Sequence, residues 1–168
     1  MTDRLVDYYV NRAVGGAAML VTEPLGMLHW QTIPTRPHVL SGLNDELLPR
    51  WAEAVAKAGA LLLAQVQDNG RGSRSGFRNL TARGASALPD DLSGTIPQPL
   101  DTGEVHQMID EFARSSAMVA RAGFAGVEIS AGHGHIFHQF LAARSNLRED
   151  EFGGDLAGRA RLLTLLIK

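Results

Sequence analysis

Short apolar runs alternate with segments of helical periodicity along most of the chain. The runs are typical of parallel strands buried on both faces, and they cover residues 17–23, 60–67 and 125–130. Apolar residues recur at helical spacing in the intervening segments, which cover residues 4–14, 43–58, 102–122 and 156–168. The order helix–strand, repeated three times and followed by another helix, predicts an α/β fold with helices outside a parallel sheet.

Capping residues and prolines mark where these elements begin and end. Asn44 or Asp45 is the expected N-cap of the second helix, and Thr102 that of the third. A glycine follows each of the first three helices, as is common at helix C-termini. Residues 73–101 contain three prolines and show no periodicity. They predict a long irregular loop, which in a compact domain is usually functional.

Polar side chains gather at the ends of the predicted strands, and this favours a barrel over a doubly wound sheet. They are Glu23, Gln65, Gln67, Glu128, Ser130 and His133. In a (β/α)8 barrel such strand ends converge on one mouth that holds the active site. Three strands do not close a barrel, and the last helix is still apolar at its end. We therefore expect a partial TIM (β/α)8 barrel of about three βα units, a single domain over residues 1–168 that is a fragment or half of a split protein.

Composition narrows the class of protein without naming it. The 168 residues are 45% hydrophobic and 20% charged, and the net charge of −2 gives no electrostatic case for nucleic acid or anionic membranes. The absence of cysteine excludes disulfides, thiolate metal sites and iron–sulfur clusters within the chain, and it fits a reducing cytoplasm. The first residues lack the features of a signal peptide, and no apolar run approaches the ~18 residues of a membrane span.

Three histidines follow the third predicted strand, in the sequence HGHIFH: His133, His135 and His138. Imidazole titrates near neutral pH, so these side chains suit substrate binding and proton transfer. Histidine is also a common zinc ligand, although no well-placed carboxylate completes a metal signature here. The third interpretation is that they are ordinary polar residues of a loop.

Two polar side chains interrupt the apolar strands. A buried Gln65 needs several hydrogen-bond partners, which a flavin pyrimidine ring or the neighbouring backbone would supply. Glu128 needs a partner as well, and we expect a structural ion pair with an arginine, the candidates being Arg71, Arg148 and Arg159. Residues 146–154 predict a structured excursion that arginine–aspartate pairs hold and glycines turn.

Several ordered motifs resemble the old yellow enzyme family of flavin-dependent ene reductases, including its dienoyl-CoA reductase branch. VDYYVNRAVGGAAMLVTE is similar to the family's Y..RA.GG.GLI.TE, and AQVQDNGR to Q(L/V)xHxGR. GFAGVEIS, followed by HGH, QFL, N.R.D.FGG and R.R, is similar to the family's fourth strand and the segment after it. The resemblance covers most of the chain and implies a TIM barrel with FMN as cofactor and NAD(P)H as reductant.

The resemblance also implies roles for individual residues. Gln65 matches the glutamine that hydrogen-bonds the flavin, and Glu23, Arg71 and Glu128 match residues that line or brace the site. His133 matches the second member of the pair that grips the substrate's activating oxygen. His135 stands at the position of the tyrosine that usually protonates the substrate carbon.

Three positions depart from the family pattern. Ser130 stands where the first histidine of the gripping pair is usual, Asp68 where the histidine of QxxHxGR is usual, and His135 where tyrosine is usual. These changes predict either altered substrates or decayed catalysis. The family's first strand and its phosphate-binding loops would lie outside residues 1–168, so we expect the isolated chain to bind FMN weakly.

The leading hypothesis is an FMN-dependent oxidoreductase in which reduced flavin passes hydride to an activated alkene of the enone or enoyl type. His133 and Ser130 would hold the acceptor oxygen, His135 would supply the proton, and Gln65 and Glu23 would contact the flavin. The rival hypothesis is a non-catalytic subunit or degenerate fragment that completes a partner's barrel. Expected partners are a small-molecule substrate and either a second copy of the chain or a complementary barrel half. A metal-dependent barrel hydrolase is the third hypothesis.

Overall fold

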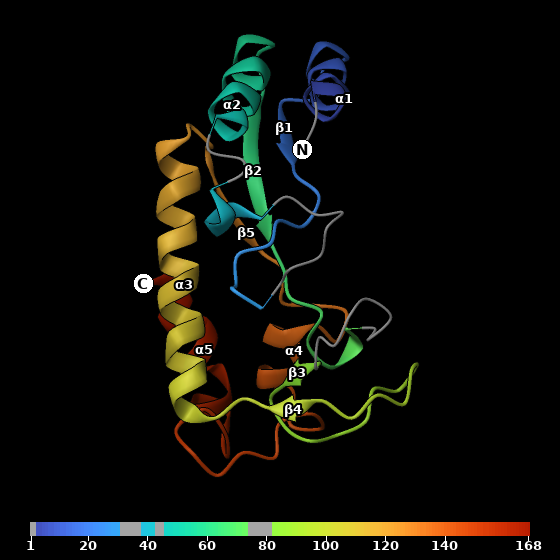
Figure 1. Cartoon of the computed structure of the whole chain (residues 1–168), viewed down its shortest axis with the longest axis vertical. Coiled ribbons are helices and arrows are strands. Elements are labelled where there is room, and N and C mark those ends of the chain that lie inside the picture. Colours follow the sequence, from blue (N-terminus) through green and yellow to red (C-terminus); the bar gives the residue numbers. More distant parts are fainter. Residues whose placement is uncertain (1–2, 31–37, 43–45, 74–81) are drawn as a thin grey trace. The chain divides into compact units, whose positions relative to one another are not determined.

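The computed structural model describes residues 3–30, 38–42, 46–73 and 82–168. Its elements, in chain order, are α1 (Asp3–Val14), β1 (Met19–Val21), η1 (Val39–Ser41), α2 (Leu47–Lys57), β2 (Leu61–Val66), η2 (Gly70–Gly72), β3 (Arg83–Gly84), β4 (Gln98–Pro99), α3 (Thr102–Arg121), β5 (Gly126–Ile129), α4 (Ile136–Leu141) and α5 (Leu156–Ile167) (Figure 1). The chain forms two compact units, Met1–Val66 with Arg114–Ile129, and Gln67–Ala113 with Ser130–Lys168.

The first unit contains a three-stranded parallel sheet in the order β1-β2-β5. β1 pairs with β2 from Met19↔Leu61 onward, and β2 pairs with β5 from Leu63↔Gly126 to Val66↔Ile129. Gly126 lets the strands meet here, because a Cβ at this position would lie 2.9 Å from Leu63 Cδ2. The parallel strands of an α/β fold are thus confirmed.

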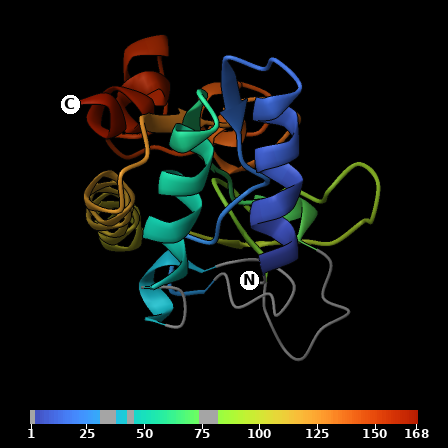
Figure 2. The same ribbon diagram turned by 90° about the horizontal axis from the view of Figure 1, so that it is seen from above.

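Helices α1 and α2 lie side by side and pack against β1 and β2 (Figures 1 and 2). Their apolar faces meet at Trp51, which is fully buried and contacts Tyr9 and Phe124 edge-on, with ring centroids 4.9 and 5.8 Å away. Aromatic pairs in this geometry stabilise a core beyond the area they bury. The helical spacing of the sequence predicted both helices, whereas the proposed caps Asn44 and Asp45 lie outside the described residues.

The N-cap of α3 differs from the predicted one. Thr102 is the first helical residue, and its hydroxyl donates to Asp150 instead of capping the helix. Asp101 is the cap: its Oδ1 accepts from the Glu104 N–H at 2.7 Å, and Glu104 Oε2 accepts from the Asp101 N–H at 2.9 Å. This reciprocal pair is a capping box with aspartate in the leading position, and it satisfies two backbone donors at once.

The second unit is built around its own apolar core. Phe112 contacts Phe137 edge-on at 6.1 Å between ring centroids, and Phe140 contacts Phe152 in the same way at 6.5 Å. The short parallel strands β3 and β4 lie within the segment that we predicted to be irregular, and residues 74–81 of that segment lie outside the described residues. Helix α4 was not predicted at all, because its six residues follow a glycine-rich loop.

Candidate functional site at the carboxyl ends of the strands

At the carboxyl end of the sheet, Gln65 and Glu128 occupy paired positions on β2 and β5. Gln65 is half-buried, and its Nε2 donates to Glu128 Oε1 at 2.7 Å. The predicted ion pair of Glu128 is therefore wrong: its carboxylate is exposed and accepts from an amide. Arg71 and Arg148 pair instead with aspartates of the second unit, Asp91 and Asp150.

Glu23 lies two residues beyond β1, and its carboxylate side chain is exposed. Its backbone N–H donates to the Tyr9 hydroxyl at 2.7 Å. Burial is the main cause that raises the pKa of Tyr9 above its ordinary value, so this hydroxyl stays protonated. The contact fixes the backbone at the position that the sequence assigned to flavin binding.

Residues 130–135, which we call the histidine loop, belong to the second unit and follow β5 directly. Ser130 is half-buried, His133 is exposed, and His135 is half-buried with its ring centroid 6.0 Å from that of His133. Among the described residues, His133 is the one non-glycine residue with a positive φ, at 58°. Left-handed backbone is unfavourable for a side chain with a Cβ, and residues held there cluster at functional sites.

The structure therefore groups the predicted site residues into two sets. Gln65 and Glu23 lie in the first unit, with Glu128 beside Gln65. Ser130, His133 and His135 lie in the second unit on one continuous loop.

His138 and Gln139 follow this loop on α4 and bond back to it. The sequence pattern singled out His138 as a candidate and Gln139 as part of the QFL motif, but it predicted neither bond. His138 Nδ1 accepts from the Gly134 N–H at 2.9 Å, and Gln139 Nε2 donates to the Gly134 carbonyl at 2.6 Å. The signal for α4 was present in the sequence, since its apolar residues Ile136, Phe137 and Phe140 are all buried at helical spacing.

Asp68 occupies the position where the resembling family usually has histidine, and its role here is structural. The side chain is buried, and its Oδ1 accepts from the Gly70 N–H at 2.6 Å. Its carbonyl accepts from the Ile136 N–H at 2.9 Å, which ties the start of α4 to the segment after β2. This aspartate forms an Asx turn, a common use of the residue in loops.

The predicted excursion at residues 146–154 is confirmed. Arg148 forms a two-pronged ion pair with Asp150 and also donates to the carbonyls of Ala85 and Leu100. Asn146 Nδ2 donates to the Phe140 carbonyl at 2.6 Å. Bidentate arginine–carboxylate bonds fix geometry as well as charge, so this segment is held rigidly beside α4.

The ionisation of Asp150 predicts a loss of stability in acid. The Arg148 bond lowers the pKa of Asp150 from 3.8 to about 2, helped by Thr102 and the Phe152 N–H and opposed by burial. A carboxyl with a lowered folded-state pKa stabilises the fold above 3.8, and that contribution disappears as the pH falls through about 2. Urea unfolding at a series of pH values should show a loss of about 2 kcal/mol across this window.

Asp150→Asn should remove most of this pH dependence, because the variant has no carboxyl to protonate at this position. Glu149→Gln changes the exposed neighbouring acid and should keep the wild-type slope. Equal slopes for wild type and Asp150→Asn between pH 4 and pH 2 would contradict the assignment.

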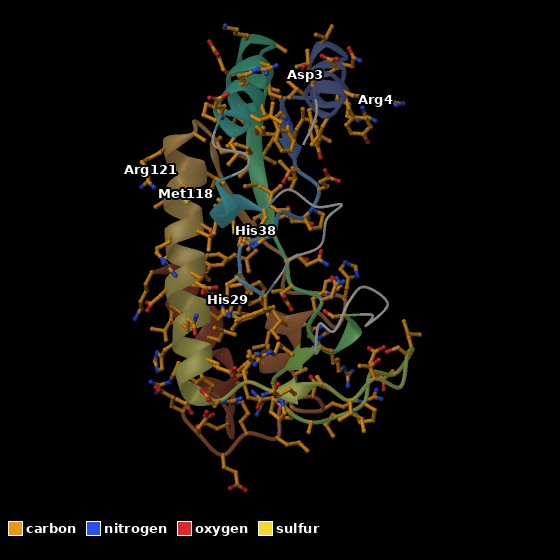
Figure 3. All side chains as sticks on the ribbon, viewed as in Figure 1. Asp3, Arg4, His29, His38, Met118 and Arg121 are labelled. Carbon is orange, nitrogen blue, oxygen red and sulfur yellow. The ribbon has the colours of Figure 1, made fainter. Side chains whose placement is uncertain are left out.

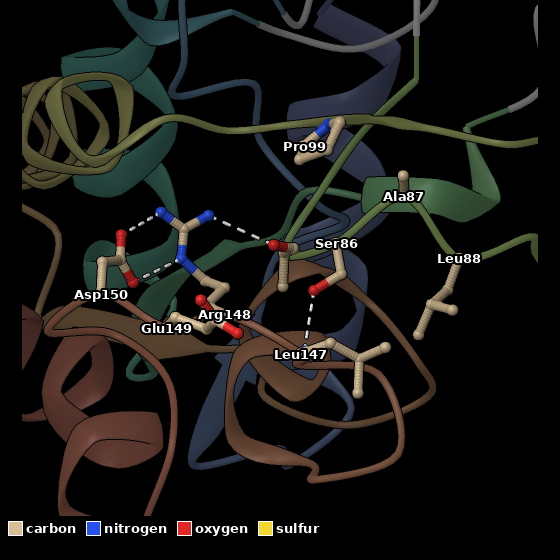
Figure 4. Close-up of a pocket in the computed structure, with 9 residues that line it drawn as sticks. Ser86, Ala87, Leu88, Pro99, Leu147, Arg148, Glu149 and Asp150 are labelled. Atoms are coloured by element: carbon tan, nitrogen blue, oxygen red, sulfur yellow. Dashed lines mark hydrogen bonds and ion pairs between the residues drawn. The ribbon is translucent and has the colours of Figure 1, made fainter.

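A pocket of about 480 Å³ lies beside the same excursion, lined by residues 85–88, Pro99 and residues 147–150 (Figure 4). The Arg148 guanidinium points toward Asp150 along one wall, and the Ser86 hydroxyl accepts from the Leu147 N–H at 2.9 Å. None of the site residues predicted from the sequence lines this pocket.

The metal interpretation of the histidines gains no support from the geometry. Within the described ranges, no group of three histidine, cysteine or acidic side chains lies close enough to hold a metal ion. His29 and His38 lie in the first unit on the segment after β1, where His38 Nε2 is 2.7 Å from the Leu28 carbonyl oxygen (Figure 3).

No helix in the described part of the chain has the length and apolar character of a membrane span.

Comparison with known proteins identifies the class. The profile of the NADH:flavin oxidoreductase / NADH oxidase family matches residues 1–168. The chain is 33% identical to a metal reductase of Desulforamulus reducens, covering 95% of the chain and 24% of that protein. It is 32% identical to 12-oxophytodienoate reductase 1 of Oryza sativa subsp. japonica, and the match covers 95% of the chain and 44% of that protein. Old Yellow Enzyme from Pichia sp. AKU4542 superposes with a TM-score of 0.89 at 26% identity, covering 99% of this chain and 47% of that one.

The chain belongs to the NADH:flavin oxidoreductase / NADH oxidase family. The resemblance to old yellow enzymes is thereby confirmed, and so is the fold, since the parallel β-strands and outer helices match part of such a TIM barrel. The family also confirms the predicted cofactors, FMN with NAD(P)H as its reductant. The chain spans between about a quarter and a half of the length of these relatives.

Proposed function

We propose that this chain forms part of a flavin-dependent oxidoreductase that reduces an activated alkene of the enone or enoyl type. Support comes from the family match over residues 1–168 and from the polar residues at the carboxyl ends of β1, β2 and β5. Barrel enzymes carry their catalytic groups at this edge of the sheet. NAD(P)H is the reductant of the flavin, and the substrate is a small molecule.

The observation that carries the proposal is the hydrogen bond from Gln65 Nε2 to Glu128 Oε1. It fixes the orientation of the glutamine amide, which retains its oxygen as an acceptor and a second N–H as a donor. The pyrimidine edge of a flavin carries hydrogen-bond acceptors on either side of an N–H donor. The oxygen and the remaining N–H of the Gln65 amide can therefore pair with groups on this edge. We assign Gln65 to this edge and Glu23 to the flavin-facing end of β1.

The histidine loop is assigned to the substrate. When bound, FMN supplies the hydride that the β-carbon of the alkene receives. Ser130 and His133 hold the carbonyl oxygen of the substrate through O–H and N–H donors, and His135 delivers a proton to the α-carbon. Ser130 is a neutral donor, so it polarises this oxygen less than a protonated imidazole would.

Replacing Gln65 with leucine tests the flavin assignment. Leucine keeps the size of the side chain and removes both polar groups, so flavin should bind about tenfold more weakly for each hydrogen bond lost. Quenching of FMN fluorescence during titration measures the affinity in the polypeptide that carries this chain. Gln98→Leu changes an exposed glutamine of β4 and is the matched control. Equal flavin affinity for wild type and Gln65→Leu would refute the assignment.

A second candidate function is that of a barrel half that binds another polypeptide, and the exposed apolar residues of the sheet favour it. Met19 and Leu61 are each 58% exposed, and none of the four residues of β5 is buried. Parallel sheets normally have both faces covered. The FMN fluorescence titration also tests this candidate. A chain that binds no flavin by itself, but binds it after mixing with a polypeptide that carries later barrel strands, would support it.

A further inference from the structure

A single buried side chain, Gln139, joins the two loops of the second unit that continue from β2 and β5. It is 2% exposed, and its Nε2 donates to the Gly134 carbonyl at 2.6 Å. Its Oε1 accepts from the Arg71 N–H in η2 at 3.4 Å. Amide groups at this depth are costly unless they are bonded, so both ends of Gln139 are committed to backbone.

The residue that Gln139 holds, Gly134, separates the two histidines assigned to the substrate. Its N–H donates to His138 Nδ1 at 2.9 Å, so side chains of α4 take both of its backbone polar groups. Because Nδ1 accepts, the neutral His138 ring carries its proton on Nε2. His138 thus holds the peptide between His133 and Gly134, and Gln139 holds the peptide between Gly134 and His135. Because each peptide group is planar, fixing both restricts the directions in which the two histidine side chains leave the backbone.

Two glycines make room for the Gln139 amide. A Cβ at Gly70 would lie 2.3 Å from Gln139 Nε2, and one at Gly84 would lie 3.3 Å from Oε1. Gly70 also has a φ of +57°, in the left-handed region that favours glycine. The backbone of η2 at Gly70 therefore approaches the amide more closely than any other residue type would allow, and the approach at Gly84 in β3 is tight.

We propose that Gln139 is the positioning residue of the histidine loop: it fixes the Gly134–His135 peptide and thereby, together with His138 on the preceding peptide, the directions of His133 and His135. The part of this inference that concerns catalysis rests on the proposed function of those histidines. The part that concerns the loop conformation rests on the contacts of the second unit alone.

Replacing Gln139 with methionine tests the inference, because methionine keeps the shape and removes both hydrogen-bonding groups. In NMR spectra the fold should persist, while the imidazole signals of His133 and His135 move and the Arg71 amide, which loses its acceptor, exchanges about tenfold faster with solvent. A residue that served the core alone would lower the unfolding temperature without moving these histidine signals selectively. Unchanged histidine signals with wild-type exchange at the Arg71 amide would overturn the proposal.

Gly70→Ala is the second variant, and it leaves Gln139 in the chain. Its Cβ should displace the amide and reproduce the changes of Gln139→Met. Gly94→Ala is the matched control, because Gly94 has a φ of +69° but nothing within 4 Å of its Cβ position. The same histidine shifts in Gly94→Ala, or complete unfolding of both Gln139→Met and Gly70→Ala, would also overturn the proposal.

A kinetic measurement separates this inference from the proposed function. In a flavin-loaded polypeptide, Gln139→Met should slow reoxidation by an enone and change its pH profile, while reduction by NAD(P)H proceeds at the wild-type rate. If Gln139→Met shifts the histidine signals but its flavin is reoxidised by the enone at the wild-type rate, the catalytic part of the proposal is overturned. If wild type binds no flavin, the proposed function fails, and the NMR result still decides the structural part.

Discussion

Replacing Gly153 with alanine is expected to lower the free energy of unfolding by roughly 3 kcal/mol. A Cβ at this position would lie 2.1 Å from the Arg148 carbonyl oxygen and 2.5 Å from its carbon. Both atoms belong to the backbone of the excursion that the Arg148–Asp150 pair holds, so neither moves without breaking that pair. Urea unfolding monitored by circular dichroism measures the loss.

The adjacent Gly154 offers the matched control. Its φ is +70°, and nothing lies within 4 Å of its Cβ position. Gly154→Ala should therefore cost only the strain of left-handed backbone, about 1 kcal/mol. Gly158→Ala should resemble Gly153→Ala, since its Cβ would lie 2.0 Å from the Gly153 carbonyl oxygen. Equal losses at Gly153 and Gly154 would show that conformation, and not the close backbone approach, sets the cost.

Replacing Trp51 with alanine is expected to cost about 3–5 kcal/mol of folding free energy, which is the usual range for a buried tryptophan. The indole is fully buried between the rings of Tyr9 and Phe124, so its removal leaves a cavity where α1 and α2 meet. Thermal and urea unfolding of the variant measure the loss, and the fluorescence of Tyr8 and Tyr9 together reports on the first unit.

Trp51→Phe is the control for this prediction. Among the described residues the indole Nε1 has no hydrogen-bond partner, although it is buried. Phenylalanine removes this unpaired donor and keeps an aromatic contact, so the loss should be about 1–2 kcal/mol. A loss for Trp51→Ala no larger than that for Trp51→Phe would mean that the aromatic cluster contributes little to stability.

The long elements were predictable from the sequence because their apolar residues repeat with a clear period. Helices α2, α3 and α5 and the three strands of the parallel sheet lie within the predicted segments, and α1 begins one residue before its segment. Helix α4 was missed because its helical spacing extends over only six residues after a glycine-rich loop, which are too few for the pattern to stand out. The cap of α3 was misplaced because aspartate and threonine are adjacent and both are good caps; which one faces the Glu104 N–H depends on the backbone.

The candidate site residues follow from a sequence pattern, but the contacts that they make do not. Polar residues at strand ends pointed to Gln65, Glu23, Ser130 and the histidines, since parallel strands present their carboxyl ends together. The partner of Glu128 was wrong because register, not sequence distance, puts it beside Gln65. Gln139 belongs to the QFL motif, but its contacts were not predictable, because they depend on the space left by glycines in segments far away in the sequence.

The central claim is that this chain carries flavin-facing and substrate-facing groups of an alkene reductase. The most direct test is to load the polypeptide that carries the chain with FMN, reduce it anaerobically with NAD(P)H and add a simple cyclic enone. Recovery of the oxidised-flavin absorption together with the saturated ketone, and a much slower recovery in His135→Phe, is the result we predict. A flavin that NAD(P)H reduces but that no enone reoxidises, or a polypeptide that takes up no FMN at all, would contradict the claim.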